Sequence, residues 1–229
     1  MKFTSYGHSC FAVEINNKHL LFDPFISGNE LAAAIQVDEI KADYIFISHG
    51  HADHILDAEA IAIRTGATVI CTWEIHEWLH AKGVTNTHPM NIGGERAFDF
   101  FTVKCTVAQH SSMLLDASYG GNPMGFIITA NEQSFYYSGD TALTMDMQLI
   151  PLWAKLQFAV LPIGDNFTMG MQDAVRAALF VKTTTVVGVH YDTFGYIKIN
   201  HQEAIDVFAK EGIKLHLLAV GEEMDFSNL

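Results

Sequence analysis

Short apolar runs separated by turn signals predict strands and helices in the first half of the chain. Residues 11–15 alternate between apolar and polar positions, Asn16 and Asn17 provide a turn, and residues 18–22 return, which predicts a β-hairpin. Residues 44–48 and 68–72 have the composition of buried strands. Helical patterns follow them at residues 57–64 and 73–82, and Gly83 ends the second helix.

The second half of the chain has the same character. The patterns predict strands at 97–108, 125–130, 134–138, 158–163, 185–190 and 214–220, and helices at 172–181 and 202–210. Strands with interspersed helices in two similar halves favour an α+β fold with two packed sheets and helices outside, although the pattern alone does not settle the architecture. Because no linker-like composition interrupts the chain, we expect a single domain over residues 1–229.

Composition narrows the protein class. The 229 residues are 49% hydrophobic, which is ample for one buried core, and no apolar run is long enough to span a membrane. The start, MKFTSYGHSC, lacks the apolar core of a signal peptide. Cys10, Cys71 and Cys105 are widely spaced, which argues against a disulfide framework or a cysteine metal site. We therefore expect a cytoplasmic protein in a reducing compartment.

The net charge of the chain indicates which kinds of molecule it could bind. With 13 Lys and Arg against 26 Asp and Glu, the formal net charge is −13, and no basic surface for nucleic acid is visible. A metal site would offset this acidity locally, so we expect a small-molecule substrate, with an anionic one favoured. The sequence leaves a homo-oligomer open.

The stretch SHGHADH (residues 48–54) gathers metal-capable side chains at the end of the buried strand 44–48. His49 and His51 are two residues apart, so in an extended strand end they point to the same side. Asp53 and His54 follow in a turning segment and can reach a second metal position. Neutral imidazole and carboxylate are natural ligands of zinc and its neighbours. The other interpretation of this stretch is a solvated polar loop.

Three further residues of the same chemical kind end apolar strands. His110 follows residues 103–109, Asp140 follows the strand at 134–138, and His190 follows the strand at 185–189. Each residue alone is more often a structural hydrogen-bonding group. Together with the histidine-rich stretch, they favour metal ligation, because strand ends hold ligands rigidly.

These motifs resemble the metallo-β-lactamase superfamily. HxHxDH, a later single histidine, an aspartate in SGDT and a late histidine match its pattern over essentially the whole chain. YGHSCF and PIGDNFTMG resemble a branch of small, single-domain metal-dependent hydrolases related to ascorbate-6-phosphate lactonase. The resemblance implies a four-layer αββα sandwich with the site along one sheet edge. His51 at the second position favours hydrolysis over the di-iron branch, which has glutamate there.

The resemblance also implies a two-metal site. One ion would be held by His49, His51 and His110, and the other by Asp53, His54 and His190, with Asp140 bridging. Zinc is the first choice of metal, and manganese or nickel are alternatives. A water held by two such ions would attack an ester, lactone or phosphodiester. Asp53 would act as the catalytic residue, orienting the water and moving a proton.

Two alternatives to this function remain open. HEWLH (residues 76–80) matches the H-E-x-x-H helix motif of zinc metalloproteases through His76, Glu77 and His80. The longer form of that motif requires a histidine where this chain has Asn86, and a protease would leave the other ligands unexplained. A metal- or metabolite-binding sensor without turnover is the second alternative.

Residues around the predicted ligands are candidates for other roles. His8, Asn166 and Thr168 are expected substrate-binding residues, and Asp165 belongs to the same stretch as the last two. The alternatives are a histidine bonded to the backbone and a polar turn. Ser48 and Asp57 are close enough in sequence to bond the ligating imidazoles and fix their tautomers.

Overall fold

The computed structural model describes residues 1–227 and divides the chain into two compact units. Unit 1 comprises Met1–Asn91, Ser111–Pro123 and the chain from Ala219, and unit 2 comprises Ile92–His110 and Met124–Leu218. The chain therefore passes between the units four times, after residues 91, 110, 123 and 218. The expectation of a single domain over residues 1–229 stays a prediction.

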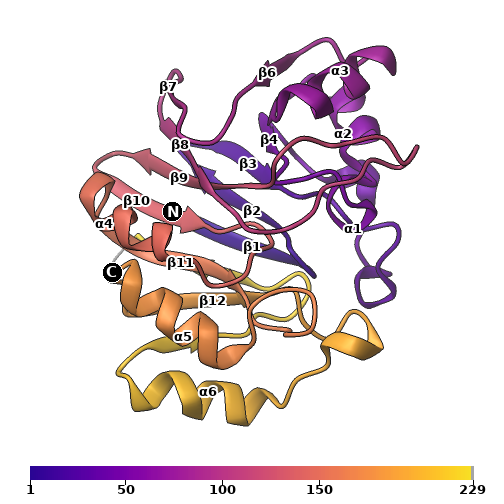
Figure 1. Ribbon diagram of the computed structural model, residues 1–229. Helices are drawn as coiled ribbons and strands as arrows, with labels where there is room; N and C mark the ends of the chain where they lie inside the picture. Colours follow the sequence, from indigo (N-terminus) through magenta and orange to yellow (C-terminus); the bar gives the residue numbers. More distant parts are fainter. Residues whose placement is uncertain (228–229) are drawn as a thin grey trace. The chain divides into compact units, whose positions relative to one another are not determined.

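Unit 1 contains a seven-stranded mixed sheet of order β14-β1-β2-β3-β4-β5-β6 (Figure 1). Its strands are β1 (Lys2–Gly7), β2 (Cys10–Ile15), β3 (Lys18–Phe22), β4 (Tyr44–Phe46), β5 (Thr68–Cys71), β6 (Thr87–Pro89) and β14 (Glu223–Asp225). Its helices are α1 (Ala52–Ile55), α2 (Ala58–Thr65) and α3 (Trp73–Ala81), with 3₁₀ turns η1 (Glu30–Ala32) and η2 (Val37–Glu39). The predicted hairpin of residues 11–22 is confirmed as β2 and β3.

The two faces of this sheet carry different side chains. On one face, strand residues such as Ile45 and Val69 form one buried cluster with Ile61 of α2 and Leu79 of α3. On the other face, a phenylalanine stack crosses β1 to β4, with ring centroids 4.6–4.8 Å apart between neighbours. Alternation of side chains across a strand separates the two sets. The helices therefore cover one face of the sheet.

Unit 2 contains the second seven-stranded sheet, of order β13-β12-β11-β10-β9-β8-β7. Its strands are β7 (Glu95–Ala97), β8 (Thr102–Val107), β9 (Met124–Ala130), β10 (Gln133–Tyr137), β11 (Leu156–Pro162), β12 (Thr185–Val189) and β13 (Lys214–His216). Its helices are α4 (Ile150–Trp153), α5 (Met171–Phe180) and α6 (His201–Lys210), with 3₁₀ turns η3 (Met145–Leu149) and η4 (Gly195–Ile197).

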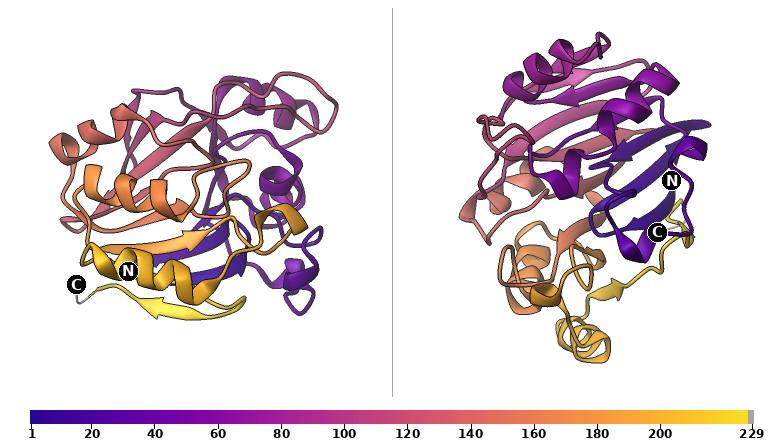
Figure 2. Two further views of the ribbon diagram at one scale, coloured as in Figure 1. Left: turned by 60° about the horizontal axis from the view of Figure 1, so that its bottom comes forward. Right: turned by 90° about the vertical axis from the view of Figure 1, so that its right-hand side faces the viewer.

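Helices α5 and α6 lie side by side along one face of this sheet (Figure 2). Ala177 of α5 and Phe208 of α6 share a buried cluster with Leu161 and Val186 of the strands. Asn200 caps α6 by accepting a hydrogen bond from the Glu203 amide. Each unit thus supplies one sheet with helices on one of its faces, as the α+β prediction requires.

Parallel pairing brings several strand ends to one edge in each unit. In unit 1, β3, β4 and β5 are parallel neighbours, so their carboxyl ends meet. In unit 2, β10, β11 and β12 are parallel neighbours, and β8 runs in the same direction because both β8 and β10 are antiparallel to β9. The predicted ligands follow these ends.

Two predicted strands are shorter than the pattern indicated. The run 97–108 is broken by a turn in which the Phe98 amide donates to the Phe101 carbonyl, and only Glu95–Ala97 and Thr102–Val107 are strands. The run 214–220 ends at His216, where pairing with β12 stops. Within residues 1–227, no helix is long and apolar enough to cross a membrane.

Candidate metal centre

Asp23 anchors the histidine-rich stretch of unit 1. It follows β3 directly, has a left-handed φ of 40° and is fully buried. Its carboxylate accepts the Ser48 amide at 2.7 Å and the Ser48 hydroxyl at 2.6 Å. It also lies 2.8 Å from Nδ1 of His54. Charge-assisted bonds of this kind are about twice as strong as neutral ones, so one carboxylate fixes both ends of the stretch.

The same anchor sets the orientation of His49. The Ser48 hydroxyl donates to Asp23, so it accepts from Nδ1 of the fully buried His49, 2.9 Å away. This assigns the proton of His49 to Nδ1 and leaves Nε2 with a lone pair. Nε2 lies 3.0 Å from Nδ1 of His51. Two nitrogens bound to one zinc ion at about 2.0–2.1 Å would lie roughly 3.3 Å apart, so the pair fits a metal.

A second group in unit 1 surrounds Asp53. Its Oδ2 lies 3.0 Å from Nε2 of His8 and 3.9 Å from Nε2 of His54. One ligand atom from each of these three residues lies within 4.8 Å of the others. His54 gives Nδ1 to Asp23, so its Nε2 is the nitrogen turned toward Asp53. His8 sits in the β1–β2 turn with a left-handed φ of 54°, and its side chain is fully buried.

Unit 2 contains the remaining three predicted ligands, and two of them, His110 and His190, lie near the third, Asp140. Oδ2 of this carboxylate lies 2.9 Å from Nε2 of His190 and 3.8 Å from Nε2 of His110. Asp140 and His190 are each 2% exposed. A buried carboxylate between two imidazoles is costly unless a proton or a cation compensates its charge. The donor chemistry of this group therefore fits a divalent ion.

The thiols are not part of this chemistry. Burial raises the pKa of Cys10, Cys71 and Cys105, the last to about 12, so all three are protonated near neutral pH. A metal binds the thiolate rather than the thiol. Among residues 1–227, no cysteine belongs to a cluster of three or more convergent ligand atoms, so the candidate ligands are nitrogen and oxygen atoms.

Ser48 and Asp57, which were expected to bond the ligating imidazoles, have different partners in the structure. Ser48 bonds His49, as described above. Asp57 contacts no predicted ligand and instead accepts the Ile26 amide, the Ser27 amide and the Ser27 hydroxyl. That interpretation of Asp57 was wrong, because its carboxylate turns toward the loop after β3. Asp23 was missed by the sequence analysis, although it too is an acidic residue directly after an apolar strand.

The predicted substrate residues Asn166 and Thr168 lie on a tight loop in unit 2. Gly164 and Gly170 pair at its base, and the Met169 amide donates to the Thr141 carbonyl at 3.0 Å. Thr141 directly follows Asp140. The loop is therefore tied to the chain beside the predicted bridging ligand, while the side chain of Asn166 is exposed.

The HEWLH helix, α3, has a different arrangement. The rings of His76 and His80 lie 5.5 Å apart, as expected four residues apart on a helix. His76 bonds the Thr87 hydroxyl at 2.5 Å through Nδ1 and lies 3.5 Å from Glu77 through Nε2. Across residues 1–227, the clusters of three or more convergent His, Cys, Asp or Glu ligand atoms include none from α3.

Comparisons with known proteins agree with this chemistry. The family described as Beta-lactamase superfamily domain matches residues 18–191. A UPF0173 metal-dependent hydrolase of Flavobacterium johnsoniae is 51% identical over 225 residues, covering 98% of this chain and 100% of that protein. Another, of Methylacidiphilum infernorum, is 49% identical over 98% of this chain and 99% of its own length.

Solved structures are similar along almost the whole chain. Igni18, described as a novel metallo hydrolase from the archaeon Ignicoccus hospitalis, matches with a TM-score of 0.88 and 34% identity over 97% of each chain. The isothiocyanate hydrolase from Delia radicum gut bacteria matches with a TM-score of 0.80 and 23% identity over 99% of this chain and 100% of that one. The fold class predicted from the sequence is confirmed by these matches.

Proposed function

The chain belongs to the β-lactamase superfamily and is a metal-dependent hydrolase, and from this premise we propose that it holds two divalent ions and cleaves an ester, lactone or phosphodiester bond of a small substrate. The hydrolase relatives do not favour the sensor alternative. The family assignment and the arrangement of α3 likewise do not favour the metalloprotease alternative.

The position of Asp140 is the observation that carries this proposal. Its Oδ2 lies near Nε2 of both His110 and His190 within unit 2. Because we assign those two imidazoles to different ions, a carboxylate near both of them supports the proposed role of Asp140 as the bridge. It also supplies the negative charge that two neighbouring cations need.

We assign His49, His51 and His110 to one ion, and Asp53, His54 and His190 to the other, with Asp140 bridging. Ser111, the residue next to His110 in the chain, has its hydroxyl 3.4 Å from Nε2 of His51 within unit 1. Chain connectivity therefore supports placing His110 with His51. Zinc is the first choice of ion, because every ligand is an imidazole or a carboxylate.

Bound in pairs, divalent ions lower the pKa of water toward neutrality and stabilise negative charge in the transition state. The residues of this chain would position the attacking water. Asp53 would hold the attacking water by a hydrogen bond and pass its proton to the leaving group. His8, bonded to Asp53 at 3.0 Å, would keep that carboxylate in place, and its buried side chain favours this role over direct contact with the substrate.

The test is a panel of matched acetate, lactone and phosphodiester substrates with protein loaded with zinc, manganese or nickel. We expect hydrolysis of at least one class, loss of activity on chelation and recovery when the ion is returned. Turnover that persists in chelated, metal-free protein would contradict the proposal. So would the absence of turnover of every class by protein carrying its full metal content.

A further inference from the structure

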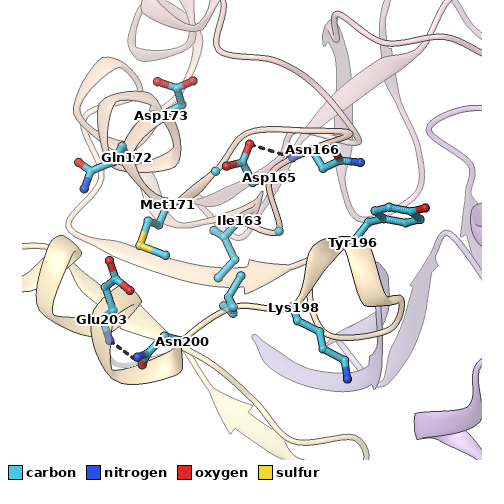
Figure 3. Close-up of a pocket in the computed structure, with 13 residues that line it drawn as sticks. Ile163, Asp165, Asn166, Met171, Gln172, Asp173, Tyr196, Lys198, Asn200 and Glu203 are labelled. Atoms are coloured by element: carbon cyan, nitrogen blue, oxygen red, sulfur yellow. Dashed lines mark hydrogen bonds between the residues drawn. The ribbon is translucent and has the colours of Figure 1, made fainter.

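A cavity of about 580 Å³ lies in unit 2, at the carboxyl end of β11 (Figure 3). Its volume is within the range of small-molecule sites, about 300–1,000 Å³. Three segments surround it: the loop after β11, the first turn of α5, and residues 196–203 leading into α6. Every lining residue belongs to unit 2.

The cavity wall is built against the backbone of a predicted ligand. A Cβ on Gly164, which lines the cavity, would lie 2.0 Å from the His190 carbonyl oxygen. The Ile163 amide donates to the Val189 carbonyl at 3.1 Å. A molecule in this cavity would thus lie next to the loop that carries His190.

Backbone strain gathers around the same cavity. Asp165 and Asn166, which line it, and His190 and Asp192, in the loop that Gly164 approaches, all have left-handed φ values between 56° and 63°. Left-handed conformations of non-glycine residues cluster at ligand sites. The Asp165 carboxylate stabilises the first loop by accepting the Asn166 amide at 2.8 Å.

The floor and the rim of the cavity differ in chemistry. Ile163, Met171 and Ile199 supply an apolar floor. The other lining residues form the rim and carry hydrogen-bond acceptors and donors, namely the carboxylates of Asp165 and Glu203, the amides of Asn166, Gln172 and Asn200, and Lys198, whose ammonium group is directed away from Glu203 in Figure 3. Figure 3 shows the Glu203 carboxylate directed from α6 toward Met171.

Several rim groups are available to a ligand. Among residues 1–227, the side chains of Asn166, Gln172 and Glu203 make no hydrogen bond or ion pair. Asp173, by contrast, is paired with Arg176 at 2.8 Å. The rim then holds two carboxylates against one ammonium group, which disfavours an anion here. Phe167 and Tyr196, both exposed, meet edge to face at 6.2 Å beside this rim.

We propose that this cavity binds a neutral, hydroxyl-rich part of the substrate, of the size of a monosaccharide ring. Hydroxyl groups both donate and accept, so they match a rim of carboxylates and amides, and the C–H face of such a ring matches the apolar floor and an aromatic edge. The inference rests on the proposed hydrolase function. An anionic group of the substrate would lie outside this cavity.

The test compares 6-O-acetylglucose with cyclohexylmethyl acetate. Each is the acetate ester of a primary alcohol attached to a six-membered ring, and only the first carries ring hydroxyls. We expect kcat/KM for the hydroxylated ester to be at least about tenfold higher, because rim groups that bond hydroxyls stay unpaired with the apolar ester. Asn166→Gly, which keeps the left-handed conformation, and Glu203→Ala should each lower this preference several-fold. Gln202→Ala is the control, because Gln202 bonds Asp206 and does not line the cavity.

A second readout does not depend on turnover. Methyl glucoside added to the metal-free protein should shift the NMR amide signals of Gly164, Gly170 and Gln172, and Glu203→Ala should weaken that effect. Equal turnover of both esters with no such shifts would overturn the inference and leave the hydrolase proposal intact. If neither ester is hydrolysed by any metal-loaded form, the binding result alone decides whether the cavity takes a polyol.

Discussion

Asp23 illustrates what single residues contribute to this site. It bonds Ser48 twice and His54 once, so its carboxylate orients side chains assigned to both ions. The sequence indicated the candidate ligands because imidazoles and carboxylates stand in a dense motif. It did not show Asp23 as their support, because a lone aspartate before Pro24 looks like a turn residue.

We predict that Asp23→Asn lowers metal affinity about 10–100-fold, because residues that orient metal ligands carry effects of that size. The lost charge-assisted bonds should also cost about 1.5–3 kcal/mol of unfolding free energy. Asp57→Asn is the matched control, since Asp57 is also buried and accepts three hydrogen bonds in unit 1. It should lose similar stability and keep its metal affinity. Competitive chelator titration and denaturant unfolding measure the two quantities, and equal affinities in the two variants would contradict the role of Asp23.

Truncating a histidine of the SHGHADH stretch should have a different effect from truncating a histidine of α3. His51→Ala removes an imidazole whose Nδ1 lies 3.0 Å from Nε2 of His49, so we expect loss of metal. His76→Ala removes an α3 imidazole that bonds Thr87 of β6 and belongs to no cluster of convergent ligand atoms in residues 1–227, so this variant should keep the full metal content. Elemental analysis of both purified variants measures this. The reverse result would move the site to α3.

At the level of elements, the candidate ligands follow strands that the sequence predicted, whereas the limits of some of these strands differ from the prediction. His110, Asp140 and His190 follow apolar runs, and parallel strands end at the same edge, so the three could be expected together. The run 97–108 was predicted as one strand from its pattern of apolar and polar residues. Phe98 and Phe101 instead stack at 5.0 Å across a turn, a contact that periodicity does not encode.

The chain directly after β11 approaches the loop after β12 closely at Gly164, and this contact should be sensitive to substitution. A Cβ on Gly164 would meet the His190 carbonyl at 2.0 Å, so Gly164→Ala should push that loop away, cost about 1–3 kcal/mol and weaken metal binding. Gly195→Ala is the control, because a Cβ there meets nothing within 4 Å. Calorimetry and metal titration of the pair check this. Equal stability and affinity would show that His190 does not depend on the close contact.

At the level of the whole molecule, neither unit is a continuous segment, because the chain passes between them four times. We therefore predict one cooperative unfolding transition, as expected for a single domain. Ions that bind only the native protein should raise its midpoint, since ligand at 100 times its dissociation constant adds about 2.7 kcal/mol. Calorimetry with and without chelator measures this. Two separate transitions, only one of which responds to chelator, would contradict the single-domain prediction.

The metal content of Asp140→Asn tests the central claim most directly. Asparagine keeps the size of the side chain but removes the charge between His110 and His190. Circular dichroism should show a folded variant. Elemental analysis should find close to two ions per chain in the metal-loaded native protein and about one in the variant, with most of the hydrolytic activity lost. A variant that keeps both ions and the native rate would show that Asp140 is not a bridge and that the two-metal account is wrong.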